Sequence, residues 1–206
     1  MAVNTKTVKV PIGIRKALWA KITAEPDAAH PTYDATILDL GAAVKGTLAI
    51  TTATLSIYGD DTEQLRDEAF VSAQVDVETT CSDLELNASV YGHTYSSTDG
   101  EDSGKDDHAP YGGYGYIEPV LLKDKSVVFR ATFLRRVCAI ASSEKSDAAT
   151  RADSITVQNN AVSFACSADA TGSWRARKEF TGDGAEAAAL AWISTSMTRL
   201  VSRLET

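Results

Sequence analysis

The nine residues AFVSAQVDV, from position 69 to position 77, decide the fold class of this chain. Apolar side chains stand at every second position of the stretch, and mostly polar residues stand between them. Because successive side chains of a strand point to opposite faces, this period of two predicts a half-buried β-strand. Residues 127–133, VVFRATF, repeat the pattern. The predicted core face of the first strand carries Ala69, Val71, Ala73, Val75 and Val77.

Other stretches extend this β pattern along the chain. Residues 45–58 are rich in Thr, Ile and Leu, which favours a strand exposed on one side. Strands are also expected over 17–23 and 174–180, and the pair Asn159-Asn160 predicts a hairpin over 155–166. In YGGYGY, residues 111–116, glycine among tyrosines indicates a strand that another backbone approaches closely.

Two helices interrupt the strands. Ser82 and Glu85 have the spacing of a capping box, and Gly92 supplies a left-handed stop. The apolar stripe of that helix would be Leu84, Ala88 and Tyr91. A second helix is expected over 184–204, with a box in Asp183 and Glu186. Its stripe has helical spacing and predicts packing on a core or partner. The stripe consists of Leu190, Ile193, Met197, Leu200 and Leu204.

The chain is expected to be one β-rich domain, because no repeat or linker divides its 206 residues. Two segments, 25–46 and 96–108, are predicted to be long surface loops, which are usually functional or mobile. The cysteines Cys81, Cys138 and Cys166 form no CxxC pair, which fits a reducing compartment. Neither a leader nor a membrane span of about 18 apolar residues is expected.

The net charge of −8 is unevenly distributed. Residues 60–107 hold 14 acidic and two basic side chains, whereas the remainder holds 14 acidic and 18 basic ones. One interpretation is a solvated acidic face, and the other is an acidic surface that meets a basic surface of the next copy. The cationic runs, Arg135-Arg136 and 175–178, are too short to favour nucleic-acid binding.

No set of residues points to catalysis or to a cofactor, so the chain is expected not to be an enzyme. His30, His93 and His108 lack the spacing of a helical zinc pair, and no nucleophile elbow or phosphate loop is present. The one metal candidate is the acidic loop, where Asp99, Glu101 and Ser103 take positions 1, 3 and 5 of a calcium-loop template. Pro110 stands where that template needs a bidentate glutamate.

A series of short motifs follows in order along the chain, from about residue 10 to about residue 197. The motifs are Ile12-Gly13, Tyr58-Gly59-Asp60-Asp61, the alternating strand into the Ser82 helix, Tyr91-Gly92-His93, Ala109-Pro110-Tyr111 with Gly113, Gly115, Tyr116 and Ile117, Phe129-Arg130-Ala131, Asp153-Ser154-Ile155, Gly172-Ser173-Trp174-Arg175, and Glu186-Ala187 to Ala191-Trp192-Ile193. Their order resembles the major tail protein family of long-tailed, non-contractile bacteriophages. Two places differ from the family pattern: Gln158-Asn159-Asn160 and Ser163 replace a Thr-Pro and a glycine, and residues 198–206 extend past the usual end.

This resemblance implies a two-sheet β-sandwich or barrel of the tail-tube type, with one flanking helix and a C-terminal helix. Six copies would form a ring, and stacked rings would enclose a tape-measure protein and later pass DNA without sequence-specific binding. Tail terminator and tail-tip proteins would be further partners, and the protein would lie in the virion tail after assembly in the host cytoplasm. A prophage, bacteriocin or gene-transfer particle would use the same subunit.

The resemblance also suggests which residues assemble. The segment 25–46 would reach the adjacent ring, with Asp27, His30, Tyr33, Asp39 and Lys45 as contact candidates. An acidic surface would line the lumen, where it repels phosphate, or would contact a neighbouring subunit. That surface would consist of Asp99, Glu101, Asp102, Asp106 and Asp107. The alternative function is a monomeric β-sandwich that binds carbohydrate or another surface ligand through Tyr111, Tyr114 and Tyr116. A hydrolase is the third possibility.

Overall fold

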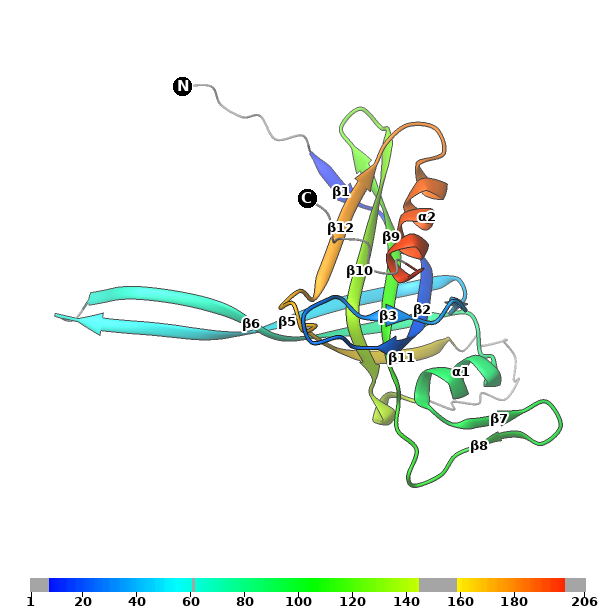
Figure 1. Cartoon of the computed structure of the whole chain (residues 1–206). Coiled ribbons are helices and arrows are strands. Elements are labelled where there is room, and N and C mark those ends of the chain that lie inside the picture. The colour runs from blue at the N-terminus through cyan, green and yellow to red at the C-terminus, as the bar shows by residue number, and fades with distance from the viewer. Residues whose placement is uncertain (1–7, 61, 145–158, 199–206) are drawn as a thin grey trace, which may run out of the picture.

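The computed structural model describes residues 8–60, 62–144 and 159–198 (Figure 1). These residues are mainly β, as the alternating sequence predicts, and they form one large sheet, a small hairpin sheet and two α-helices. The strands are β1 Lys9–Pro11, β2 Arg15–Ala24, β3 Thr32–Tyr33, β4 Leu38–Asp39, β5 Ala43–Gly59, β6 Thr62–Thr79, β7 Thr94–Ser96, β8 Gly100–Asp102, β9 Tyr111–Leu122, β10 Val127–Ala139, β11 Asn160–Ser167 and β12 Arg175–Phe180, and the helices are α1 Leu84–Tyr91, the short 3-10 helix η1 Ala141–Ser143 and α2 Ala185–Thr198.

The long antiparallel pair β9–β10 is the spine of the large sheet. Each spine strand has two partners: β9 pairs with β1 near one end and with β2 near the other, and β10 pairs with β12 and then with β11. From β11 the sheet continues through β6 to β5. The family resemblance implied two sheets, but in the described residues hydrogen bonds join these strands into one sheet of ten strands. Because β9 and β10 each pair with two strands in succession, the sheet can change direction there without dividing into two sheets.

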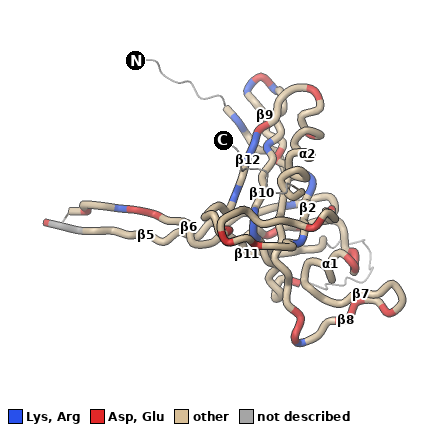
Figure 2. The backbone as a smooth tube through the Cα atoms, in the orientation of Figure 1, with Lys and Arg blue, Asp and Glu red and all other residues tan. Residues whose placement is uncertain are grey.

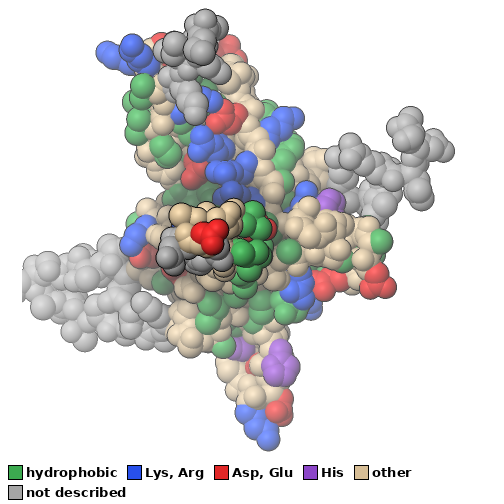
Figure 3. Space-filling model, turned by 90° about the vertical axis from the view of Figure 1, so that its left-hand side faces the viewer, with side chains coloured by type: hydrophobic (Ala, Val, Ile, Leu, Met, Phe, Trp, Pro, Cys, Tyr) green, Lys and Arg blue, Asp and Glu red, His purple; other side chains and the backbone are tan. Residues whose placement is uncertain are grey.

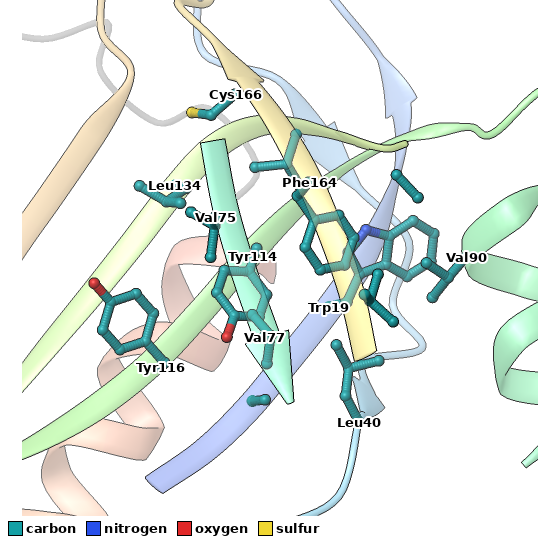
Figure 4. Close-up of a cluster of buried hydrophobic side chains, with 14 of the residues drawn as sticks. Trp19, Leu40, Val75, Val77, Val90, Tyr114, Tyr116, Leu134, Phe164 and Cys166 are labelled. Carbon is teal, nitrogen blue, oxygen red and sulfur yellow. The ribbon is translucent and has the colours of Figure 1, made fainter. Parts of the chain in front are cut away.

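The large sheet curls, and a first hydrophobic core lies between its β2–β9 part and its β6–β11 part (Figure 4). Trp19 of β2 and Tyr114 of β9 face Val75 of β6 and Phe164 of β11 in this core. Tyr114 and Phe164 stack with their ring centroids 5.3 Å apart. The curl also brings Gly46 of β5 against Ile14, which precedes β2; a Cβ on Gly46 would lie 2.6 Å from Ile14 Cδ1. The alternation of β6 and β11 thus places one face of each of these strands inside.

A second core lies on the other face of the spine, under α2. Ile193 and Met197 of α2 are buried, which confirms that part of the predicted stripe, whereas Leu200 and Leu204 lie outside the described residues. The glycines of β9 are packed against side chains, not against a second backbone as expected. A Cβ on Gly115 would lie 2.4 Å from Ile193 Cγ2, and one on Gly112 would lie 2.4 Å from Trp19. Glycine is required here because β9 is covered on both faces.

The first helix begins one residue later than its capping box predicted. Asp83, not Ser82, is the N-cap, and its Oδ1 accepts a hydrogen bond from the Leu86 amide at 3.1 Å. An aspartate is the stronger cap because its charge also favours the helix N-terminus. Gly92 ends the helix in the left-handed region with φ +82°, as predicted. Leu84 is exposed, so the buried side chains of α1 are Ala88, Val90 and Tyr91.

Two other sequence predictions change in part. The segment 25–46 holds β3, β4 and the start of β5, and 96–108 holds β8, so neither is a continuous loop. The strand predicted over 174–180 is β12. The hairpin over 155–166 is described only from Asn159 onward, and β11 begins at Asn160. The described part of the chain contains no helix long and apolar enough to cross a membrane.

Candidate assembly surface

The most distinctive feature of the molecule is a two-stranded arm that projects from the body (Figure 1). We define the arm as residues 52–70, the distal parts of β5 and β6. On β5 every described side chain from Thr51 to Ile57 is exposed, and on β6 every residue from Thr62 to Ala69 is exposed. Gly59 pairs with Thr62 at the tip. At about 3.3 Å per residue, the arm reaches about 25 Å beyond the body.

A β-bulge decides which side chains each face of the arm presents. Thr51 pairs with Ser72 and Thr52 pairs with Phe70, so Val71 is an extra residue on β6. An extra residue reverses the alternation of its strand relative to the partner. The predicted core face is therefore correct for Ala73, Val75 and Val77, which are buried, but wrong for Ala69, which is exposed, and for Val71, which is 54% exposed.

Beyond the bulge the arm is amphipathic, because cross-strand partners share a face. Ala53 pairs with Ala69, Leu55 with Asp67, and Ile57 with Leu65, and together they form an outer face that we call the apolar face. Thr54 pairs with Glu68 and Ser56 with Arg66 on the polar face. Arg66 and Glu68 form an ion pair at 2.8 Å on that face.

The apolar face is open to solvent. Leu55, Ile57 and Leu65 are each about half exposed, at 55, 48 and 51%. Seen from the tip of the arm, hydrophobic side chains gather along one side of the projecting hairpin (Figure 3). Their position on a narrow ribbon, away from both cores, distinguishes them from single exposed apolar residues scattered over a body.

The arm is attached to the body through an aromatic stack. The rings of Phe70 and Trp174 lie 4.4 Å apart and nearly parallel, at 5°. Next to the base, Ser163 of β11 donates a hydrogen bond to Asp76 Oδ1 of β6 at 2.6 Å. This bond, together with one from Gln74, lowers the pKa of Asp76. The base of the arm is therefore fixed by contacts from the strands and loops beside it.

A basic strip lies on the same side of the body as the arm, along β12 (Figure 2). Arg177 and Lys178 are exposed, and Arg175 is half-buried against Trp174, with its guanidinium carbon 4.3 Å from the ring centroid. Burial and the neighbouring charge of Arg177 lower the pKa of Arg175. The arm itself carries acidic Glu63, Asp67 and Glu68 against Arg66. The two surfaces therefore have opposite charge.

The residues predicted for the inter-ring contact do not form one surface. Tyr33 is half-buried in β3, where its hydroxyl donates to the Arg135 carbonyl at 2.7 Å, and burial raises its pKa. His30 Nδ1 lies 2.7 Å from Asp169 Oδ2. Both side chains are thus hydrogen-bonded to the body, although the His30 side chain is 47% exposed.

The other three predicted contact residues are exposed but scattered. Asp27 lies in a turn, Asp39 ends β4 and accepts a hydrogen bond from the Gly41 amide at 3.0 Å, and Lys45 lies on β5. Leu40, between them, is 2% exposed in the first core. Deleting 27–45 would therefore remove core residues, so such a deletion cannot isolate a contact role.

The acidic segment of the sequence is distributed over several elements (Figure 2). Part of it lies on the arm, four of its carboxylates lie on the body part of β6 and at the start of α1, and the rest lie around the small hairpin β7–β8. Here Glu101 and Ser103 approach His93, whereas Asp99 accepts a hydrogen bond from Ser96 at 3.2 Å. The three residues of the calcium template are thus not brought together. Asp102 and Asp106 are exposed, and half-buried Asp107 accepts a bond from the Gly104 amide at 2.8 Å.

The tyrosines considered for a carbohydrate site are not available as one surface. Tyr114 is fully buried and Tyr116 is 8% exposed. Tyr111 is exposed, but the Arg136 guanidinium carbon lies 3.6 Å above its ring centroid. Comparison with known proteins adds no relative: no protein-family model matches the chain, and no curated protein shows significant similarity to it.

Sequence reasoning missed the arm, although one signal for it was present. In the sequence this signal is the strand-like run of 14 residues over 45–58. The structure extends it to the 17 residues of β5 and pairs it with the 18 residues of β6. Strands in globular bodies average about five or six residues, so runs this long exceed what the body can cover. Their length, more than their alternation, indicates a projecting hairpin.

Proposed function

We propose that this chain is a non-enzymatic structural subunit that assembles with copies of itself, in stacked hexameric rings of a phage-type tail tube. The observation that carries the proposal is the projecting arm with its apolar face. The resemblance of the sequence motifs to major tail proteins supplies the ring, the tube and the virion setting.

An amphipathic arm of this kind favours a partner on physical grounds. An isolated two-stranded hairpin is marginally stable in water, and a second layer is normally needed to stabilise it. Covering the exposed surface of Leu55, Ile57 and Leu65 would contribute about 2 kcal/mol for each side chain. The outer strand edges of β5 would also gain protection from unwanted pairing.

A second copy of the chain is the partner that the charges favour. The acidic arm and the basic strip on β12 are complementary, and such pairing steers association and fixes its register. One copy offers an arm and the next offers a strip, so the contact is head-to-tail. Head-to-tail contacts close into a ring when the rotation between copies allows it.

In the tube, the tape-measure protein would fill the assembled lumen, and tail terminator and tail-tip proteins would bind the two ends. DNA would pass through without specific contacts, and acidic side chains at the lumen would reduce its adhesion. The acidic side chains around β7–β8 are candidates for the lumen or a contact. Reversing Asp99, Asp102, Asp106 and Asp107 to lysine tests this role in assembly and infectivity.

The main experiment compares two matched lysine variants. Leu55→Lys places a charge on the apolar face opposite Asp67, and Thr54→Lys places the same charge on the polar face opposite Glu68. Both lysines gain an acidic cross-strand neighbour, so the arm itself is affected equally. The proteins are compared by light scattering on a sizing column and by negative-stain microscopy at high concentration.

Wild type and Thr54→Lys are expected to form rings or tubes, and Leu55→Lys is expected to remain monomeric. If wild type is monomeric alone, the comparison is repeated with tail-tip and tape-measure proteins present as initiators. A wild-type chain that stays monomeric in both settings would refute self-assembly. Equal assembly of the two lysine variants would remove the apolar face from the contact.

A further inference from the structure

Three side chains from distant parts of the sequence converge beside the small hairpin. His93 follows α1, Glu101 lies on β8, and Glu144 is the C-cap of η1. His93 Nδ1 lies 2.8 Å from Glu101 Oε1, and His93 Nε2 lies 3.9 Å from Glu144 Oε2. One ligand atom from each residue fits within 4.8 Å of the other two. The imidazole is thus flanked by two carboxylates.

The position of His93 is tightly determined by its neighbours. Gly92 has φ +82°, and a Cβ there would lie 2.1 Å from the His108 carbonyl oxygen, so the chain must turn sharply before His93. The His93 ring then stacks on Tyr91 with centroids 5.9 Å apart. Only 11% of the His93 side chain and 14% of the Glu101 side chain are exposed. Two of the three groups are therefore held in place and largely removed from water.

We propose that His93, Glu101 and Glu144 bind one divalent transition-metal ion of the zinc type. One imidazole and two carboxylates suit Zn²⁺ or Mn²⁺ better than Ca²⁺, which takes six to eight oxygen ligands. Zinc–nitrogen and zinc–oxygen bonds of about 2.0–2.2 Å place tetrahedral ligand atoms about 3.4 Å apart. The Glu144 carboxylate must move toward the other two ligand atoms to reach this separation. Its side chain is 39% exposed and has the freedom to do so.

The remaining groups around the site fit this assignment. Ser103 Oγ lies 3.2 Å from His93 Nδ1 and can hydrogen-bond to a coordinated carboxylate once the nitrogen carries the metal. Water would complete the coordination. The ion would join the β7–β8 hairpin to the η1 turn. These two segments are far apart in the sequence, so without the ion their connection depends on side-chain contacts. Binding would therefore stabilise this end of the body.

The test is titration calorimetry of the full chain with ZnCl2 after removal of metal by a chelator. We expect one ion per chain, and an increase in Tm of about 5–10 °C at a 100-fold excess over Kd. Glu101→Gln is expected to weaken binding at least about tenfold, and His93→Gln still more. Glu85→Gln, the same change on the exposed first turn of α1, is the control and should leave binding unchanged.

Binding of Co²⁺ provides a spectroscopic check, because its visible absorption reports nitrogen and oxygen ligands in a low-coordinate site. Absence of saturable 1:1 Zn²⁺ binding would overturn the proposal. The same holds if Glu101→Gln and His93→Gln bind Zn²⁺ as tightly as wild type, or if Ca²⁺ binds as tightly as Zn²⁺. These measurements use binding alone, so their outcome is independent of whether the chain forms rings.

Discussion

Phe70 marks the place where the arm leaves the body, and its stack on Trp174 provides a quantitative test of how the arm is held. Truncating either ring to alanine removes the stack and leaves the rest of the strand pairing in place. Complete removal of a buried phenylalanine costs about 3–5 kcal/mol. Phe70 is only half-buried, so we expect Phe70→Ala to lower the free energy of unfolding by about 2 kcal/mol.

The interaction energy of the two rings is separate from this cost. A parallel pair at 4.4 Å contributes about 0.5–1.5 kcal/mol beyond the area it buries. Trp174→Ala also loses the contact with Arg175, which contributes about 0.5 kcal/mol more. The double variant should therefore be less destabilised than the two single variants combined, by about 1 kcal/mol.

Urea unfolding followed by far-ultraviolet circular dichroism, at a concentration where the chain is monomeric, measures each of the four free energies. The matched control is the cycle of Trp174→Ala with Phe180→Ala. Phe180 lies at the other end of β12 and pairs with Trp192, not with Trp174. That cycle should be additive within about 0.3–0.5 kcal/mol. A Phe70–Trp174 coupling no larger than this would refute the stack as the attachment of the arm.

Two further predictions concern the body. Gly115→Ala should lower the free energy of unfolding by about 1–3 kcal/mol, because its Cβ would lie 2.4 Å from Ile193 Cγ2 of α2. Gly104→Ala, on the exposed loop after β8, should change it by less than about 0.5 kcal/mol, because its Cβ would lie 3.3 Å from Asp107 Oδ1. Equal effects of the two variants in urea unfolding would contradict the packing argument. Burial alone would raise the pKa of Asp169, but hydrogen bonds from Thr171, His30 and Ser173 bring it below its ordinary value. A lowered pKa in the folded state contributes stability above the ordinary aspartate pKa of about 3.9, and that stability is lost as the pH falls through the folded pKa. Wild type should therefore lose stability below about pH 4 more steeply than Asp169→Asn, and parallel curves of unfolding free energy against pH would contradict this assignment.

Local sequence patterns determined much of the secondary structure. The alternation over 127–133 and the Thr-rich run 45–58 are strands, and Gly92 ends α1 as its position after an apolar stripe predicted. The helical spacing of Ile193 and Met197 also identified the buried face of α2. These signals are reliable because the period of side chains along a strand or helix is a local property. The choice between Ser82 and Asp83 as N-cap was not settled by spacing alone, since both side chains can accept the same kind of hydrogen bond.

Only the tertiary structure decided where each strand lies and what covers it. The alternation over 69–77 includes Val71, yet the bulge there moves Val71 to the outside and gives the arm its apolar face. The convergence of His93, Glu101 and Glu144 was equally hidden, because the turn after α1, the β7–β8 hairpin and the η1 turn bring them together. A sequence period says which residues share a face. Register, bulges and long-range pairing decide whether that face meets a core, a partner or water.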